Sequence, residues 1–295
     1  MTKLTESKKT EKSIIFLHIP KVGGTTVNKI IDRQYKQNTI YRIRTDSRKR
    51  IQDCVDEFKV IPSSEKERIK VVMGHMGFGL HDFLPQPSVY ITLLRDPIER
   101  TISYYYYVLR KSNHYLHQKV TYEKMSLEDC INTGISTELD NSQTRILSAS
   151  NGDSDSTVPF GQCNEEMLEK AKKNLQEHFI GVGLVESFDK SLLLFKKLLN
   201  WNNTFYLKRN VTKSRPLQSD FSQETLNLIK KQNEFDIELY KYASELFNQQ
   251  VAQQGSSFEK ELQKFDQLNS LYGNTYGRLY SLASSTIKKF KNQLL

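Results

Sequence analysis

The sequence predicts an α/β fold in three layers, in which a central, mainly parallel sheet is flanked by helices and followed by a helical C-terminal extension. Continuous apolar runs, typical of strands buried on both faces, alternate with amphipathic segments. Such alternation favours right-handed crossovers between parallel strands. After about residue 220 the composition changes, and apolar residues recur at helical spacing. The sheet is therefore expected before residue 220.

The expected elements follow in chain order. Strands are predicted at residues 14–19, 69–73, 89–94, 179–185 and 205–208, with 40–43 as a candidate for a further short strand. Helices are predicted at residues 25–36, 47–58, 97–110, 123–132, 165–177 and 187–199. Ser222 is a candidate start for the first of the later helices. The polar segment 148–156 is expected to form a mobile loop.

Composition divides the chain into three parts. Residues 1–12 form a polar tail that is expected to be flexible, residues 13–250 form the main domain, and residues 251–295 form a helical extension. For the end of this extension, a solvated helix is favoured over one that lies on an anionic membrane surface. No apolar stretch approaches the roughly 20 residues of a membrane span, and residues 1–12 lack the apolar segment of a signal peptide. A cytoplasmic protein is expected, with peripheral membrane contact as the alternative.

Charge and cysteine content exclude some classes of function. The 295 residues carry a formal net charge of +9, which favours anionic partners such as nucleotides or acidic glycans. The sequence shows no recognisable nucleic-acid-binding motif, so no nucleic-acid partner is expected. The three cysteines lack CxxC spacing and, being odd in number, predict no disulfide framework. No set of metal ligands is recognisable around the histidines, so no metal is expected.

The stretch HIPKVGGTT, residues 18–26, has the character of an anion-binding turn. It follows the first predicted strand and precedes a helix, so Gly23 and Gly24 allow close backbone approach while the helix start exposes unpaired N–H groups. In the nucleoside-triphosphate loop GxxxxGK[ST], the lysine follows the last glycine and the next hydroxyl holds Mg²⁺. Here Lys21 precedes the glycines, which favours a phosphate-based donor without a metal over ATP with magnesium. A purely structural Gly-Gly turn is the alternative.

The stretch VYITLLRDPIERTISYYYYVLR, residues 89–110, brings a second cation to the same edge of the sheet. Arg95 emerges at the end of a predicted strand, and Ser103 lies in the second turn of the helix that Pro97 begins. An arginine and a hydroxyl can hold one phosphate from two sides. The alternative is a structural ion pair of Arg95 at the helix start. Tyr107, a turn beyond Ser103, is a candidate for substrate contact.

Six histidines are candidates for a general base near neutral pH. His75 follows the predicted strand 69–73 at the sheet edge where both motifs emerge, and ligands of open α/β sheets bind at that edge. His75 is therefore the predicted base, with His81 as the second choice and a structural role as the alternative. His18 is expected to orient the turn that contains it. His114 is a candidate for substrate contact, with a plain surface position as the alternative.

HIPKVGGTT together with YITLLRDPIERTIS resembles the two cofactor-binding signatures of sulfotransferases that use 3′-phosphoadenosine 5′-phosphosulfate (PAPS), nearest the heparan sulfate 6-O- and 2-O-sulfotransferase group. The resemblance runs from about residue 14 to 247 and includes DNSQTRILS, FIGVGLVESF, NVTKSRP and NEFDIELYKYASELF. It implies a P-loop-like fold and a sulfotransferase domain over residues 13–250. The implied reaction moves the sulfuryl group of PAPS to an acceptor hydroxyl, with adenosine 3′,5′-bisphosphate (PAP) as product and no metal.

The resemblance also implies roles for individual residues. His75 would take the proton of the acceptor hydroxyl, while Lys21 would stabilise charge on the departing phosphate oxygen. The residues implied to bind the cofactor are His18, Ile19, Pro20, Lys21, Val22, Gly23, Gly24, Thr25 and Thr26 at the 5′-phosphosulfate, Arg95 and Ser103 at the 3′-phosphate, and Lys213, Ser214 and Arg215 in a further loop.

The resemblance makes a hydroxylated saccharide or glycan the expected acceptor. The tryptophans that help line the glycan cleft of the 6-O group are missing after His75, where Met76, Gly77 and Phe78 stand, so heparan sulfate itself is not expected. A P-loop-type kinase and a non-catalytic glycan- or nucleotide-binding module are the alternative functions. The position of Lys21 and the lack of a clear acidic metal ligand after a strand disfavour the kinase.

Overall fold

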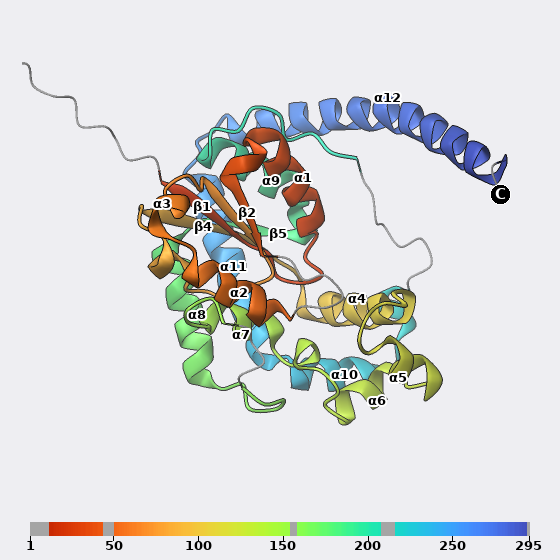
Figure 1. The fold of residues 1–295 in the computed structure, drawn as a ribbon. Coiled ribbons are helices and arrows are strands. Elements are labelled where there is room, and N and C mark those ends of the chain that lie inside the picture. The colour runs from red at the N-terminus through yellow and green to blue at the C-terminus, as the bar shows by residue number, and fades with distance from the viewer. Residues whose placement is uncertain (1–11, 44–49, 154–157, 208–215, 294–295) are drawn as a thin grey trace, which may run out of the picture.

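A computed structural model describes residues 12–43, 50–153, 158–207 and 216–293 of the chain (Figure 1). Within these residues a single sheet contains five parallel strands in the order β2-β3-β1-β4-β5. The predicted α/β class with a parallel central sheet is confirmed, including the short strand at 40–43. The strands are β1 (Ser13–Leu17), β2 (Ile40–Ile43), β3 (Val71–Gly74), β4 (Ser88–Leu94) and β5 (Phe179–Leu184).

The strand register brings three segments of the chain to one edge of the sheet. Leu17, the last residue of β1, pairs with Gly74 of β3 and with Thr92 of β4. β1 is buried along its whole length, in agreement with its continuous apolar sequence. Because the strands are parallel, the segments that follow β1, β3 and β4 all leave at the carboxyl edge. Both predicted motifs and His75 begin there.

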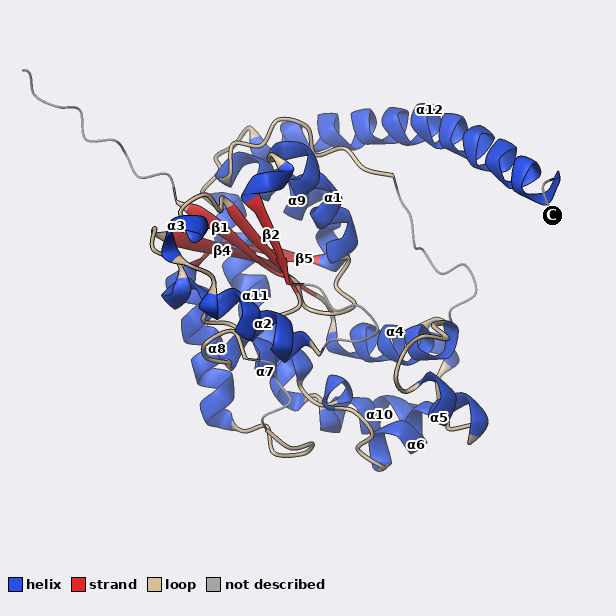
Figure 2. Cartoon of the chain, viewed as in Figure 1, coloured by secondary structure: helices blue, strands red, loops and turns tan. Residues whose placement is uncertain are grey.

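Helices cover both faces of the sheet (Figure 2). In Figures 1 and 2, α1 and α9 lie on one face, and α7, α8 and α11 lie on the other. One hydrophobic cluster joins the sheet to these helices. The helices are α1 (Gly24–Gln34), α2 (Ile51–Val60), α3 (Ser63–Lys66), α4 (Pro97–Arg110), α5 (His117–Tyr122), α6 (Leu127–Asn132), α7 (Ser142–Ser148), α8 (Glu165–His178), α9 (Phe188–Leu198), α10 (Gln223–Gln232), α11 (Glu234–Ala252) and α12 (Phe258–Gln293).

A second hydrophobic cluster joins α4, α5, α6 and α10 beside the sheet, with Ile102 and Ile229 fully buried in it. The start of α4 is fixed by its own sequence. Asp96 accepts a hydrogen bond from the backbone N–H of Glu99 at 2.9 Å, and a proline occupies the first turn. The cap holds the first turn of α4 directly after the carboxyl end of β4. The predicted start of α10 is confirmed in the same way, by a bond from Thr225 N–H to the Ser222 hydroxyl.

The predicted strand at 205–208 is wrong: residues 205–207 pair with no strand, and residue 208 lies outside the described part of the chain. The outer edge of β5 is occupied instead by α11, because Gln250 Oε1 accepts a hydrogen bond from Val182 N–H at 3.0 Å. The carbonyl of Phe205 accepts a bond from Arg33 of α1 at 2.6 Å. Side chains thus satisfy backbone groups that a further strand would have used.

The predicted helix at 123–132 starts later than expected, with only residues 127–132 in a helix. α5 ends at Tyr122, and α6 begins only at Leu127. Lys124 between them adopts a positive φ of 52°, a left-handed conformation that a helix does not contain. The hydroxyl of Ser126 then caps α6 by accepting from Asp129 N–H at 3.0 Å.

Residues 149–153, in the segment expected to be a mobile loop, are tied to the chain after β3. Gly152 N–H donates to the carbonyl of Phe78 at 2.9 Å, and Gly77 N–H donates to the carbonyl of Gly152 at 3.1 Å. The rest of the expected loop, residues 154–156, lies outside the described part.

The C-terminal part of the chain that the structure describes is mainly helical. α11 reaches residue 252, and α12 begins by burying Phe258 and Phe265 in the main cluster. Beyond this contact α12 extends away from the body of the protein in Figure 1. Among the described helices, none has both the length and the apolar character needed to cross a membrane.

Candidate active site

The loop from residue 18 to residue 23 joins β1 to α1 and leaves the start of α1 open. Gly23 precedes the helix in the left-handed region at φ 78°, which suits glycine. A Cβ atom added at Gly24 would lie 2.1 Å from Cδ2 of the His18 ring. The buried His18 ring therefore packs directly against the helix backbone. Gly23 and Thr25 are exposed, so N–H groups of the first turn face an accessible surface.

His75 lies against this loop. Its Nδ1 is 2.7 Å from the carbonyl oxygen of His18, and the two imidazole rings are 4.3 Å apart between centroids. A carbonyl only accepts hydrogen bonds, so Nδ1 of His75 carries the proton and Nε2 carries the lone pair. Burial lowers the pKa of His75, and the His18 hydrogen bond partly opposes that lowering. The imidazole is therefore neutral at neutral pH and able to accept a proton.

Lys21 emerges from the same loop in a left-handed conformation, with φ 71°. Its ammonium nitrogen lies 4.1 Å from the centre of the Tyr107 ring, which is a cation–π contact. Burial, with further contributions from Arg110 and Arg95, lowers its pKa from 10.5 to about 8. The cation is thus held in a partly desolvated place where an anionic ligand would relieve the repulsion.

Arg95 reaches the loop from the end of β4. Its Nη1 donates to the carbonyl of Lys21 at 3.2 Å, and its Nη2 contacts Glu99 at 3.2 Å. Ser103 lies one turn beyond Glu99 and one turn before Tyr107, so these residues share a face of α4. The structure therefore brings Lys21, Arg95, Tyr107 and His75 around one loop, and Ser103 lies on the face of α4 that Tyr107 shares.

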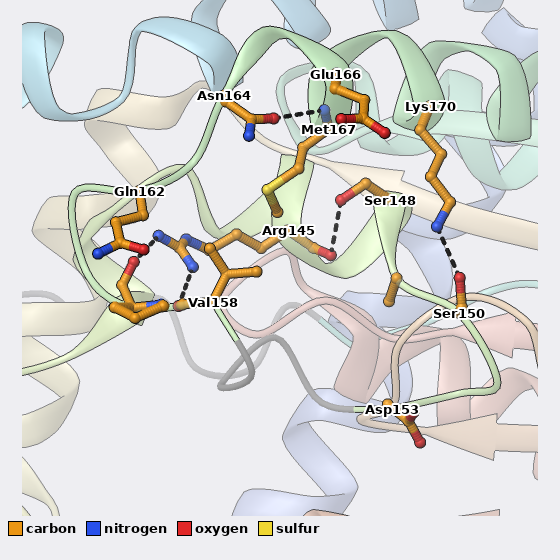
Figure 3. A pocket seen from close by; sticks show the side chains of 12 residues that line it. Arg145, Ser148, Ser150, Asp153, Val158, Gln162, Asn164, Glu166, Met167 and Lys170 are labelled. Atoms are coloured by element: carbon orange, nitrogen blue, oxygen red, sulfur yellow. Dashed lines mark hydrogen bonds between the residues drawn. The ribbon is translucent and has the colours of Figure 1, made fainter.

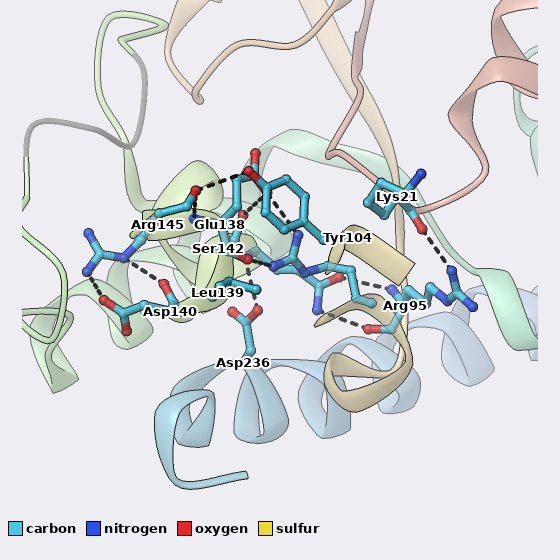
Figure 4. Close-up of polar contacts among 12 residues, drawn as sticks. Lys21, Arg95, Tyr104, Glu138, Leu139, Asp140, Ser142, Arg145 and Asp236 are labelled. Atoms are coloured by element: carbon cyan, nitrogen blue, oxygen red, sulfur yellow. Dashed lines mark hydrogen bonds and ion pairs between the residues drawn. The ribbon is translucent and has the colours of Figure 1, made fainter. Parts of the chain in front are cut away.

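Gln143, which the sequence analysis did not select, holds the backbone of Arg95. Its Oε1 accepts from Arg95 N–H at 2.9 Å, and its Nε2 donates to the carbonyl of Arg95 at 3.0 Å. Gln143 is fully buried at the start of α7. Asp236 of α11 fixes that start, because its carboxylate accepts from Gln143 N–H at 3.1 Å and from Thr144 N–H at 2.7 Å (Figure 4). A glutamine distant in sequence carries no local signal for such a role.

Glu138 is a second residue that the sequence analysis missed. Its Oε2 accepts from Nη1 of the fully buried Arg100 at 2.9 Å and from the Ser142 hydroxyl at 3.0 Å (Figure 4). Burial lowers the pKa of Lys21 and of His75, and the charge of Glu138 opposes the lowering in both. Together with Glu99, which pairs with Arg95, Glu138 adds negative charge to the cations of the candidate site.

The other predicted residues divide into three groups. His114 contacts the ring of Tyr107, with centroids 5.7 Å apart, so both candidates for substrate contact lie next to Lys21. His81, the second choice for the base, lies elsewhere: its Nδ1 is 3.0 Å from the Tyr90 hydroxyl and its ring packs on His178, which precedes β5 at the amino edge of the sheet. The residues predicted in a further cofactor loop lie outside the described part of the chain: Lys213, Ser214 and Arg215.

Two cavities adjoin these elements. One of about 210 Å³ lies beside the first turn of α1 and is lined by Thr25, Thr26, Lys29, Tyr206 and Tyr272, among others. Tyr206 also packs edge-on against the ring of Phe188, and Phe188 lies 3.3 Å from a Cβ placed at Gly23. This cavity offers aromatic surface next to the anion-binding turn.

The larger cavity, of about 570 Å³, lies along α7 and the start of α8 (Figure 3). It contains the side chain of Arg145, but the guanidinium donates to the carbonyl of Val158 at 2.6 Å and of Pro159 at 2.9 Å and also pairs with Asp140. The guanidinium charge is therefore already paired with Asp140 inside the protein.

Comparisons with known proteins agree with the predicted resemblance. A family model described as galactose-3-O-sulfotransferase matches residues 2–270. Heparan-sulfate 6-O-sulfotransferase 1-B of Danio rerio is 28% identical over 288 residues, which cover 82% of this chain and 67% of that protein. Heparan sulfate 2-O-sulfotransferase 1 of Gallus gallus is 24% identical over 258 residues, which cover 79% and 70%.

A solved structure of mouse sulfotransferase SULT7A1 complexed with PAP has a TM-score of 0.36 and 12% identity, covering 75% of this chain and 64% of that one. A likeness of this degree supports no conclusion about function.

Proposed function

The chain belongs to the galactose-3-O-sulfotransferase family, and on that premise we propose that it transfers a sulfuryl group from PAPS to a hydroxyl of a saccharide. One observation carries the proposal. Arg95, from the end of β4, donates to the carbonyl of Lys21 in the loop after β1, and His75 contacts the same loop through the carbonyl of His18. Two cations and an uncharged base thus converge at the open start of a helix.

The residues present fit an adenosine donor with phosphate groups at two positions. The exposed first turn of α1 and Lys21 suit the 5′-phosphosulfate, since helix starts and ammonium groups both favour anions. Arg95 and Ser103 suit the 3′-phosphate, which an arginine fork can hold with two hydrogen bonds. The 210 Å³ cavity beside Thr25 offers the ring of Tyr206 as a surface for the adenine.

The roles of the protein groups follow from this arrangement. PAPS supplies the sulfuryl group. Nε2 of His75 accepts the proton of the attacking hydroxyl, because its Nδ1 is already committed to the His18 carbonyl. Lys21 and the N–H groups of the α1 start stabilise the negative charge that grows on the oxygen leaving with PAP. Tyr107 and His114 line the side from which the acceptor approaches.

Replacing His75 tests the proposal. Transfer of radiolabelled sulfate from PAPS to a pooled saccharide library is measured for the wild type and for His75→Ala, with PAP binding by calorimetry as the control for folding. We expect transfer to fall by about 10² to 10⁴ with PAP affinity within a few fold of wild type. His81→Gln is the matched histidine control and should retain transfer, because His81 lies at the other edge of the sheet. Binding of ATP with Mg²⁺ but not of PAP would refute the proposal in favour of a kinase.

A further inference from the structure

Residues 205–207 form one wall of the 210 Å³ cavity beside the anion-binding turn. These three residues line it together with Thr25 of α1. They lie in no helix and pair with no strand of the described sheet. No backbone ladder therefore holds this wall, and its position depends on side chains from other elements.

The end of α1 holds the wall through hydrogen bonds. Nη2 of Arg33 donates to the carbonyl of Phe205 at 2.6 Å. Gln34 bonds the preceding residues, because its Nε2 donates to the carbonyl of Asn203 at 2.8 Å and its Oε1 accepts from Asn202 N–H at 3.0 Å. Since α1 also presents the candidate anion site at its first turn, the wall and that turn are attached to one helix.

α12 contacts the wall as well. Asn269 is 6% exposed, and its Oδ1 accepts from Tyr206 N–H at 2.8 Å. The ring of Phe205 is stacked on Phe265, with centroids 5.5 Å apart and an angle of 25° between the planes, and it lies 6.0 Å from the ring of Tyr272. Phe265, Asn269 and Tyr272 are spaced by one helical turn. One face of α12 therefore packs on the wall, and Tyr272 itself lines the cavity.

Tyr206, the ring proposed above to face the adenine, is held at several points. Its hydroxyl donates to the carboxylate of Asp189 at 2.8 Å, and its ring packs edge-on against Phe188 with centroids 5.2 Å apart. Asn269 is the partner of its backbone N–H. Loss of the Asn269 side chain would leave that N–H without its acceptor, and a partly buried donor is costly to leave unpaired. The position of the ring thus depends on α12.

The attachment of α12 to the protein does not depend on Asn269 alone. Its first turns bury Phe258 at 2% exposure and pair Glu261 with Lys197 of α9, whose Nζ lies 2.8 Å from both carboxylate oxygens. A second ion pair, at 2.8 Å, joins α9 to the first turn of α12. Replacing Asn269 is therefore expected to loosen the wall while α12 stays attached to α9.

We propose that α12 is a positioning element of the donor site, in which Asn269 holds Tyr206 at the cavity wall and so couples nucleotide binding to the docking of this helix. This inference rests on the proposed function, and it adds to the site a helix that contains none of the residues assigned to the phosphates. The coupling is reciprocal: if docking of α12 raises the affinity for PAP, PAP must favour the docked helix by the same factor. The nucleotide and α12 thereby stabilise each other across residues 205–207.

Asn269→Ala tests the coupling, and Asn274→Ala is the matched control. Asn274 is exposed, so its replacement makes the same chemical change at a solvent-facing position of the same helix. Calorimetry should show a PAP affinity about fivefold lower in Asn269→Ala and within about twofold of wild type in Asn274→Ala. In transfer assays, Asn269→Ala should raise the KM for PAPS by a similar factor and leave kcat nearly unchanged, because the wall holds the nucleoside and not the reacting groups.

Hydrogen exchange of the full chain measures the reciprocal effect and needs no variant. Saturating PAP should slow amide exchange at residues 203–207 and 262–272 of the wild type by about fivefold, the same factor as the difference in affinity. In Asn269→Ala the slowing at residues 262–272 should be lost. The slowing at residues 24–27, beside the phosphates, should remain.

A PAP affinity of Asn269→Ala close to that of the wild type would overturn the inference, as would equal losses in both variants, a loss of kcat at unchanged KM, or exchange at residues 262–272 that PAP does not slow. If Asn269→Ala does not fold, the exchange of the wild type decides alone. A wild type that neither binds PAP nor transfers sulfate overturns the proposed function and this inference together. Wild-type PAP binding and transfer with any of the other results overturn the role of α12 alone.

Discussion

The affinity of the protein for PAP should depend on pH through Lys21. In the free protein, burial and the neighbouring Arg110 and Arg95 hold the pKa of this ammonium at about 8, below its ordinary value of 10.5. A bound phosphate would relieve that repulsion, so PAP prefers the charged form. Raising the pH through 8 removes the proton from the free protein and should weaken PAP binding.

The magnitude follows from the pKa. At pH 7 about nine tenths of the free protein carries the charged Lys21, and at pH 9 about one tenth does. If PAP binds only the charged form, its affinity should fall about tenfold over this range, and binding near pH 8 should take up about half a proton. The lowered pKa has the opposite effect on the free fold: the charged amine is penalised below pH 8, so the Lys21 contribution to stability improves between pH 8 and 10.5.

Calorimetry of PAP binding in two buffers of different ionisation enthalpy measures both the affinity and the proton uptake. Lys21→Arg is the matched variant, because a guanidinium stays charged over the whole range. We expect its PAP affinity to be flat between pH 7 and 9 and its proton uptake near pH 8 to vanish. The histidines of the site do not confuse the result, since burial holds the pKa values of His18, His75 and His114 below the usual value. A wild-type affinity that changes less than threefold, or an equal decline in Lys21→Arg, would refute the reasoning.

Two further predictions concern the parts that hold the site in place. Gln143→Glu replaces the N–H donor that bonds the Arg95 carbonyl by an oxygen that repels it. Affinity for PAP should therefore fall about tenfold, while affinity for AMP, which lacks the 3′-phosphate, should stay within twofold. Equal losses of affinity for both ligands in calorimetry would contradict the role assigned to Arg95. Gly24→Ala places a Cβ atom 2.1 Å from the His18 ring, so it should lower the free energy of unfolding by about 1 to 3 kcal/mol. Gly273→Ala in α12 is the control, because a Cβ there meets nothing within 4 Å. In thermal unfolding this control should be neutral or stabilising.

The sequence contains enough to predict the sheet and the convergence of both motifs. Runs such as Ile14–Leu17 are apolar at every position, which is typical of a strand buried on both faces. Once the strands are parallel, the segments that follow them must share an edge, and this places Lys21, Arg95 and His75 together without any knowledge of side-chain contacts. The family and the fold are confirmed, while the roles assigned to these residues in binding and catalysis stay predictions.

The apolar run at residues 205–208 predicted a strand that residues 205–207 do not form. A short apolar segment with aromatic residues is compatible both with a strand and with a stretch packed against helices. A residue distant in sequence excludes a further strand at the edge of β5. The side chain of Gln250 in α11 accepts a hydrogen bond from Val182 N–H, which a sixth strand would need as a donor. Gln250 lies 68 positions after Val182. The local sequence around residues 205–208 therefore does not indicate this competing hydrogen bond.

The residues missed in the site have a related cause. Gln143 matters because it bonds Arg95, 48 positions earlier, and it can do so only because Asp236, 93 positions later, fixes the start of α7. Both are buried polar residues, which need partners wherever they lie, and such partners are set by the tertiary fold rather than by spacing. Burial raises the pKa of Asp236, and the N–H groups of Gln143 and Thr144 oppose that rise. The position of Arg95 therefore depends on α11, and the segments DNSQTRILS and NEFDIELYKYASELF together support the candidate site.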